Sequence, residues 1–135
     1  MSSRDSSTKI GPKGDETGLQ GCRILFVVDS PVVGPFTADM LADLGCEVIG
    51  PAPNMAAARA MVLAGGFDAA LMDVHIRGDL VFPLCDILAS KNVPFILTSG
   101  YADWQSAENW RNRPRLQKPY TFEQVEKALT DLLRA

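Results

Sequence analysis

Two carboxylates and a hydroxyl stand at the ends of short, largely apolar runs in this chain, and an ammonium follows a further brief run that reads as a strand. They are Asp29, Asp73, Ser99 and Lys118. The apolar run 69–72 leads directly into Asp73 and is bounded by glycines and a polar stretch, which is typical of a strand buried on both faces. Ligands collect beyond the carboxyl ends of the strands in an open parallel sheet. If these runs are parallel strands, the four side chains meet at one edge.

These four side chains are suited to the transfer of a phosphoryl group to an oxygen nucleophile. A carboxylate can attack phosphorus and carry the group as an acyl phosphate. A second carboxylate can hold a hard divalent cation such as Mg²⁺, which prefers oxygen ligands and keeps several waters. An ammonium and a hydroxyl can stabilise the transferred oxygens, where positioning and electrostatics supply most of the catalysis. We expect Asp73 to be the working residue.

Helical segments alternate with the apolar runs, and their ends carry clear signals. Asn54 is a good N-cap for the second helix, and Thr121 with Gln124 forms a capping box for the last one. The first helix is expected to begin near Gly34 and to turn Phe36 toward the core. Five strands alternating with five helices over short connections predict an α/β fold with one five-stranded parallel sheet and helices on both faces.

The first 21 residues differ in composition from the rest of the chain. Residues 1–21 are polar and lack apolar periodicity, so they cannot offset the entropy of ordering and we expect a disordered tail. Residues 22–135 are predicted to form a single domain, long enough to bury a sizeable core without disulfide or metal staples.

Composition excludes several classes of function. The 135 residues carry a net charge of −3, which offers no basic field for nucleic acid or anionic lipid. No apolar run approaches the roughly 18 residues that a membrane span needs, and the N-terminus lacks the apolar segment of a secretory signal. Three cysteines, Cys22, Cys46 and Cys85, lie in apolar contexts without a metal-binding spacing. We therefore expect a reduced, cytoplasmic protein.

From Arg23 to the C-terminus, these residues resemble the receiver domain of two-component response regulators. The resemblance implies a (βα)5 flavodoxin-like receiver fold in which Asp73 is the phosphoacceptor. It further implies that Ser99 is the switch hydroxyl and that Lys118 pairs with the phosphate. A cis peptide bond before Pro119 is also usual in this family.

By the same resemblance, Mg²⁺ is the cofactor and is bound by Asp29, Asp73 and the backbone carbonyl of His75. Receivers usually end the first strand with two adjacent acids, and here Val28 takes the place of one of them. Fewer oxygen ligands should weaken Mg²⁺ binding. A second atypical position is Arg115, where receivers usually carry the aromatic ring that reports the switch.

Two segments resemble a subgroup, the single-domain receivers with a PFxFATGY signature that work with HWE sensor histidine kinases. They are 92–101 and 116–120. The chain has Leu97-Thr98-Ser99 where the signature has Phe-Ala-Thr. It ends soon after the last expected helix, so we expect no output domain and a role through protein contact or as a phosphate relay. Trp104 and Trp110, in a weakly helical stretch, are either core residues or a partner surface.

Three hypotheses remain open. The first is a single-domain response regulator that accepts a phosphoryl group on Asp73 from a histidine kinase or phosphotransfer protein, without being a turnover enzyme. The alternative is a degenerate receiver-like binding module that is phosphorylated poorly or not at all because of Val28. The third class comprises an aspartate-nucleophile phosphatase or a flavoprotein of this fold. The phosphatase is disfavoured because His75 stands where a second Asp is needed, and the flavoprotein because Ser30-Pro31 replace a glycine-rich phosphate loop.

Overall fold

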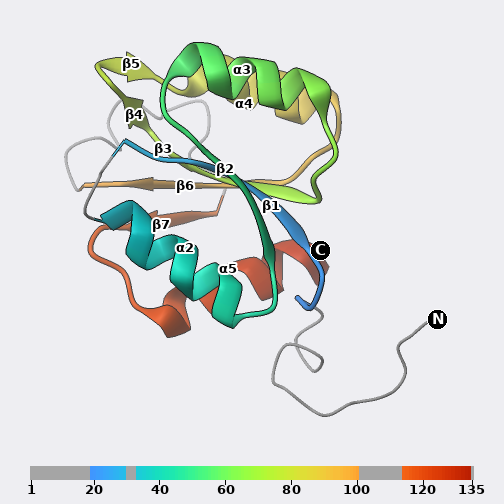
Figure 1. Ribbon diagram of the computed structural model, residues 1–135, viewed down its shortest axis with the longest axis vertical. Coiled ribbons are helices and arrows are strands. Elements are labelled where there is room, and N and C mark those ends of the chain that lie inside the picture. The colour runs from blue at the N-terminus through green and yellow to red at the C-terminus, as the bar shows by residue number, and fades with distance from the viewer. Residues whose placement is uncertain (1–18, 30–32, 101–113, 135) are drawn as a thin grey trace.

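The computed structural model describes residues 19–29, 33–100 and 114–134. A five-stranded parallel sheet in the order β2-β1-β3-β6-β7 carries helices on both faces (Figure 1). Its strands are β1 (Arg23–Val27), β2 (Glu47–Ala52), β3 (Ala69–Asp73), β6 (Phe95–Ser99) and β7 (Arg115–Gln117). The described helices are α2 (Val33–Asp43), α3 (Met55–Ala64), α4 (Phe82–Ser90) and α5 (Phe122–Arg134). The predicted parallel α/β fold is confirmed, while the fifth predicted helix, with Trp104 and Trp110, lies outside the described residues.

The central strand β3 lies between β1 and β6, and all five of its residues are buried. Its last residue, Asp73, is in register with Thr98 of β6, and Met72 is in register with Val27 of β1. Because these neighbours are all parallel, their carboxyl ends lie at one edge of the sheet. The continuous apolar run before Asp73 is therefore explained by burial on both faces.

Two apolar cores flank the sheet, with α3 and α4 on one face and α2 and α5 on the other (Figure 1). Strand residues alternate between the two cores, as a side-chain period of two requires. The α3/α4 core includes Val27, Val62, Met72, Leu88 and Leu97. The α2/α5 core includes Leu19, Ile24, Leu41, Leu71, Ile96 and Leu129.

Packed residues are present before the predicted boundary at residue 22. Leu19 is fully buried in the α2/α5 core, and its carbonyl accepts a hydrogen bond of 3.0 Å from the Cys22 amide. The Gly21 amide donates to the Gly45 carbonyl at 2.8 Å, which ties this segment to the end of α2. Because Leu19 is a single apolar residue in a polar segment, no periodicity marks it as core.

The predicted helix caps are present. The Asn54 side chain accepts a hydrogen bond of 2.8 Å from the Ala57 amide at the start of α3. At the start of α5, the Thr121 hydroxyl accepts from the Gln124 amide at 3.1 Å while the Gln124 side chain accepts from the Thr121 amide at 2.8 Å. This reciprocal pair is the predicted capping box.

The prediction for the face of α2 was wrong at Phe36. The Phe36 side chain is 64% exposed, whereas its neighbour Thr37 is fully buried. Thr37 shares a hydrogen bond of 2.7 Å with the Tyr120 hydroxyl, so the helix presents Thr37 to the sheet in place of Phe36. A buried hydroxyl with a partner from a distant segment cannot be recognised from an apolar pattern.

The connection between β3 and α4 contains a small hairpin that was not predicted. Strand β4 (His75–Ile76) pairs antiparallel with β5 (Asp79–Leu80). The two turn residues, Arg77 and Gly78, have φ values of 51° and 87°. Positive φ at both central residues is the type I′ geometry of tight hairpins. The hairpin stands beside Asp73, at the carboxyl edge of the sheet.

The edge strand β2 is longer than the segment 46–50, which reads as a short strand in the sequence. It continues through Pro51 to Ala52, with a register shift against β1. An edge strand tolerates a proline because its missing N–H is not needed on the solvent side. The Gly50–Pro51 peptide bond is cis, and a Cβ at Gly50 would stand 2.9 Å from the Phe26 carbonyl oxygen. Glycine is therefore required where β2 passes β1.

Candidate functional site

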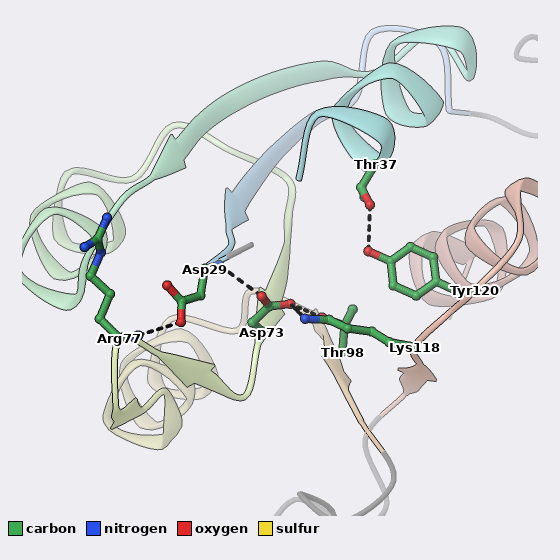
Figure 2. Close-up of polar contacts among 7 residues, drawn as sticks. All are labelled: Asp29, Thr37, Asp73, Arg77, Thr98, Lys118 and Tyr120. Atoms are coloured by element: carbon green, nitrogen blue, oxygen red, sulfur yellow. Dashed lines mark hydrogen bonds and ion pairs between the residues drawn. The ribbon is translucent and has the colours of Figure 1, made fainter. Parts of the chain in front are cut away.

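Asp73 accepts three hydrogen bonds or ion-pair contacts at the carboxyl edge of the sheet (Figure 2). The Lys118 ammonium lies 3.0 Å from Asp73 Oδ1, and the Asp29 backbone amide donates to Asp73 Oδ2 at 3.0 Å. The Thr98 hydroxyl also donates to Asp73 Oδ1. Asp73 is only 3% exposed, and burying its negative charge without partners would be costly. The three donors, which come from three different segments of the chain, compensate this cost.

Thr98 contacts Asp73 and was not among the predicted site residues. The prediction selected Ser99, which is buried at the last position of β6 and whose carbonyl accepts from the Lys118 amide at 2.9 Å. The sheet register pairs Thr98 with Asp73, so the two side chains share a face. The available signal was the period of two, since Ile96 and Thr98 lie on the face of the α2/α5 core and Ser99 follows on the other.

The backbone that carries Lys118 is anchored by the residues that follow it. Its peptide bond to Pro119 is cis, as the family resemblance implied. The next residue, Tyr120, packs against the α2/α5 core and shares its hydroxyl with Thr37. Burial raises the pKa of the Tyr120 phenol, the hydrogen bond to Thr37 lowers it, and the charge of Asp73 raises it further. The phenol is therefore neutral and anchors the segment that carries Lys118.

The opposite side of Asp73 is formed by Asp29 and the β4–β5 hairpin. The Asp29 side chain is exposed, and its Oδ2 accepts a hydrogen bond of 3.0 Å from the Arg77 amide. The Arg77 side chain extends away from Asp73 (Figure 2). Its Nε donates to the Pro53 carbonyl at 2.8 Å. Arg77 thus ties the hairpin both to the end of β1 and to the loop after β2.

Val28, the atypical residue, is 8% exposed and belongs to the α2/α5 core. It also forms part of an open pocket of about 290 Å³ beside Asp29. The pocket is lined by Val28, Asp29, Gly34, Pro35, Pro51, Ala52, Pro53 and Arg77. The wall where receivers usually place a second acid is therefore apolar.

The oxygen donors near Asp73 suit Mg²⁺ better than a transition metal. Within residues 19–29, 33–100 and 114–134, no group of three or more His, Cys, Asp or Glu side chains could hold a metal ion. The Asp29 backbone amide donates to the Asp73 carboxylate at 3.0 Å, which places the two aspartates side by side, and His75 follows two residues after Asp73. Mg²⁺ is commonly bound by one or two carboxylates with waters completing its shell. The oxygen donors present fit Mg²⁺, and the site carries one negative charge fewer than receivers usually have because Val28 replaces an acid.

Other predicted residues lie away from Asp73. Arg115 is exposed on β7, in register with Leu97, so the position where receivers usually carry an aromatic ring holds an exposed cation.

All three cysteines are free thiols. Burial raises the pKa of Cys46 to about 11, and the nearby Cys22 adds a smaller effect. None of the described helices has the length and apolar character needed to cross a membrane.

Comparisons with known proteins agree with this geometry. No family model matches the chain, and neither does any curated protein. The solution structure of SdrG from Sphingomonas melonis Fr1 is 38% identical, with a TM-score of 0.77, and the match covers 84% of this chain and 97% of SdrG. The BeF3-activated conformation of SdrG, from Pseudomonas melonis Fr1, is 37% identical with a TM-score of 0.69, over 82% and 95% of the two chains.

A more distant match extends the fold comparison. The receiver domain of the sensor histidine kinase PA1611 from Pseudomonas aeruginosa PAO1, with a magnesium ion coordinated in its active site cleft, is 24% identical. Its TM-score is 0.74 over 85% of this chain and 99% of that domain. The sheet order, the strand-end carboxylates with Lys118, and the similarity to SdrG lead to one assignment: the chain belongs to the response regulator receiver domains.

Proposed function

We propose that this protein is a single-domain response regulator that accepts a phosphoryl group on Asp73 from a histidine kinase and signals by protein contact. The observation that carries the proposal is the buried Asp73 carboxylate with the Lys118 ammonium at 3.0 Å. A carboxylate so placed is oriented for attack and has a cation ready for the charge that arrives.

In the proposed reaction, an Asp73 oxygen attacks the phosphorus of a phosphohistidine. The new oxygen–phosphorus bond forms as the phosphorus–nitrogen bond breaks, and the electron pair leaves with the imidazole. Lys118 then pairs with the phosphoryl oxygens, and the family resemblance assigns the Ser99 hydroxyl to the same group. The phosphoryl group brings roughly 1.5 to 2 negative charges beside Lys118, and because the carboxylate charge of Asp73 is lost in the reaction, the net gain is about one charge smaller.

Mg²⁺ is part of this proposal. Asp29, Asp73 and the backbone carbonyl of His75 would hold it, and when bound it supplies charge neutralisation for the phosphoryl oxygens. The magnesium ion in the PA1611 receiver domain supports a cation in this fold. The exposed Asp29 carboxylate can be reached from solvent, although one of its oxygens already accepts the Arg77 amide.

The partner and the mode of action are proposed from the sequence resemblance. The PFxFATGY-like segment 92–101 supports a histidine kinase of the HWE class as the phosphodonor. We infer a cytoplasmic phosphoacceptor that takes one phosphoryl group per chain and does not turn over a substrate. With Arg115 exposed on β7, the output is proposed to reach the partner without an aromatic switch at that position.

A second candidate function is favoured by Val28. With an apolar residue in place of an acid, the cation site has fewer charged ligands, and a degenerate receiver-like module would bind its partner without phosphorylation. Thermal unfolding measured with Mg²⁺ separates the two functions. A saturable rise in Tm supports the phosphoacceptor, and no change up to tens of millimolar supports the degenerate module.

The proposed function is tested by incubating the protein with Mg²⁺ and phosphoramidate and recording its intact mass. We expect a gain of one phosphoryl group that disappears in Asp73→Asn. Asp39→Asn, at an exposed position of α2, is the matched control and should be phosphorylated like the wild type. No gain in the wild type, or a gain that survives in Asp73→Asn, would overturn the proposal.

A further inference from the structure

Thr98 brings a hydroxyl to the phosphoacceptor from the position next to the predicted switch residue Ser99. Its side chain is 1% exposed, and it donates to Oδ1 of Asp73, the same oxygen that Lys118 contacts (Figure 2). The contact is set by the register of β3 and β6, which places Asp73 and Thr98 side by side on one face. It is therefore fixed by the sheet and does not depend on a loop conformation.

The acceptor of the Thr98 hydrogen bond is the Asp73 carboxylate, which also pairs with the Lys118 ammonium. A hydrogen bond to an ionised acceptor is roughly twice as strong as one between neutral groups, and a low local dielectric increases the difference. When Asp73 gains a phosphoryl group, its carboxylate charge is lost, because one oxygen becomes the ester-like bridge to phosphorus and the other a carbonyl. A neutral carbonyl is a weaker acceptor, so the Thr98 bond is worth less after phosphorylation.

Lys118 does not share this loss. Its side chain is long, 28% exposed and flexible, so its ammonium can follow the negative charge from the carboxylate to the phosphoryl oxygens. Thr98 has a short β-branched side chain with restricted χ1, and its hydroxyl stays where the strand puts it. The two donors to Oδ1 therefore respond differently to the same reaction.

We propose that Thr98 is a positioning residue that restrains Asp73 in its unphosphorylated form and so lowers the amount of acyl phosphate; the inference rests on the proposed function. Ser99, one position further along β6, is expected to act in the opposite direction by holding the transferred phosphoryl group. Two adjacent hydroxyls would then set the phosphorylated fraction between them.

The test compares Thr98→Val with the wild type at a limiting phosphoramidate concentration in Mg²⁺, with the phosphorylated fraction read from intact mass. We expect the ratio of phosphorylated to unphosphorylated protein to rise about fivefold, the difference between a charged and a neutral hydrogen bond. Thr98→Ser keeps the hydroxyl and should remain near the wild type. Ser99→Ala should lower the ratio. Circular dichroism verifies folding, and Thr98→Ala replaces Thr98→Val if the latter does not fold.

Each result decides the inference. A raised ratio in the hydroxyl-free variant with an unchanged ratio in Thr98→Ser supports the restraint. An equal or lower ratio in the hydroxyl-free variant, while the wild type is phosphorylated, overturns the restraint and leaves the proposed function standing. No phosphate on any variant overturns both.

A stability measurement tests the contact without phosphate. In a double-mutant cycle of Thr98→Val and Asp73→Asn, thermal unfolding should show a Tm loss for Thr98→Val that is clearly smaller in the Asp73→Asn background. Equal losses in both backgrounds would show that Thr98 acts through packing, and the restraint would be overturned.

Discussion

Asp73 has a buried side and an open side, and the two are built from different kinds of residues. On the buried side, Thr98 and Lys118 come from β6 and the end of β7, and both contact Oδ1. On the open side stands Asp29, exposed at the end of β1 and held by the amide of Arg77. The side that would receive phosphoryl oxygens is therefore fixed by the sheet, while the side that would receive a cation depends on a hairpin.

The two sides also differ in how closely they follow the receiver pattern. The buried side keeps the lysine, the cis proline bond and the strand-end hydroxyls, and adds Tyr120 as an anchor. The open side has Val28 in the place of an acid and an apolar pocket beside it. The contrast predicts that the Asp73–Lys118 pair and the strength of the proposed cation site can be changed independently by mutation.

The largest effect is expected on the buried side, from Lys118→Met. Removal of the ammonium 3.0 Å from Asp73 should slow phosphorylation by phosphoramidate about a hundredfold, since a preorganised charge at the reacting group is lost. It should also lower the free energy of unfolding by about 2 kcal/mol, because a buried carboxylate loses an ion-pair partner. Both are measured by intact mass over time and by urea unfolding.

The matched control is Lys127→Met on α5. Lys127 pairs with Asp131 at 2.9 Å, but both side chains are exposed, so the change should leave phosphorylation and stability nearly unchanged. A phosphorylation rate in Lys118→Met within a factor of about three of the wild type would contradict the role of the buried side.

Much of the buried side could be predicted from the sequence. The apolar runs before Asp29 and Asp73 and the Lys118-Pro119 pair are local patterns, and the strand-end rule brings them together once the strands are parallel. The contact between Thr98 and Asp73 could be predicted only in part. The period of two places Thr98 and Ser99 on opposite faces of the sheet, but which of them shares a face with Asp73 depends on the register of β6 against β3.

Less of the open side could be predicted. The hairpin strands are two residues long, too short for a periodic pattern, and arginine is an unusual residue for a turn with positive φ. Arg77 is stabilised there by its contacts to Asp29 and Pro53, which belong to distant parts of the sequence. The departure at Val28 was visible in the sequence, but its burial beside a pocket was not.

The open side is tested by Val28→Glu, which restores an acid beside Asp29. A further charged ligand should tighten Mg²⁺ binding about tenfold, because affinity rises with the number of charged oxygen ligands. Without Mg²⁺ the same change should lower the free energy of unfolding by about 2 kcal/mol, since a carboxylate enters a largely buried position next to other acids. Thermal unfolding over a Mg²⁺ titration measures both effects.

Val28→Gln is the control because glutamine matches glutamate in shape and lacks the charge. It should lose stability without any gain in Mg²⁺ affinity. If Val28→Gln and Val28→Glu bind Mg²⁺ equally, the missing acid does not limit the cation site. The open side of Asp73 would then not be weakened by Val28, contrary to the proposed difference between the two sides.

The smallest effect concerns the anchor of the buried side, Tyr120. Tyr120→Phe removes the hydroxyl that meets the buried Thr37 at 2.7 Å and should lower the free energy of unfolding by about 1 kcal/mol at neutral pH. The pKa of Tyr120 is raised in the folded protein, chiefly by burial, so the folded state holds the phenol proton more tightly than the unfolded chain. This contribution is complete below the unfolded pKa near 10 and is lost as pH rises through the higher folded pKa.

The wild type should therefore lose stability more steeply than Tyr120→Phe above about pH 10, and the difference between them should shrink there. Urea unfolding of both proteins at neutral and alkaline pH measures this change. Thr37→Val should cost less in the Tyr120→Phe background than in the wild type, because the two hydroxyls share one bond. Parallel pH profiles, or fully additive losses, would mean that the hydroxyl pair does not hold the Lys118 segment, and that the buried side owes its order to the sheet register.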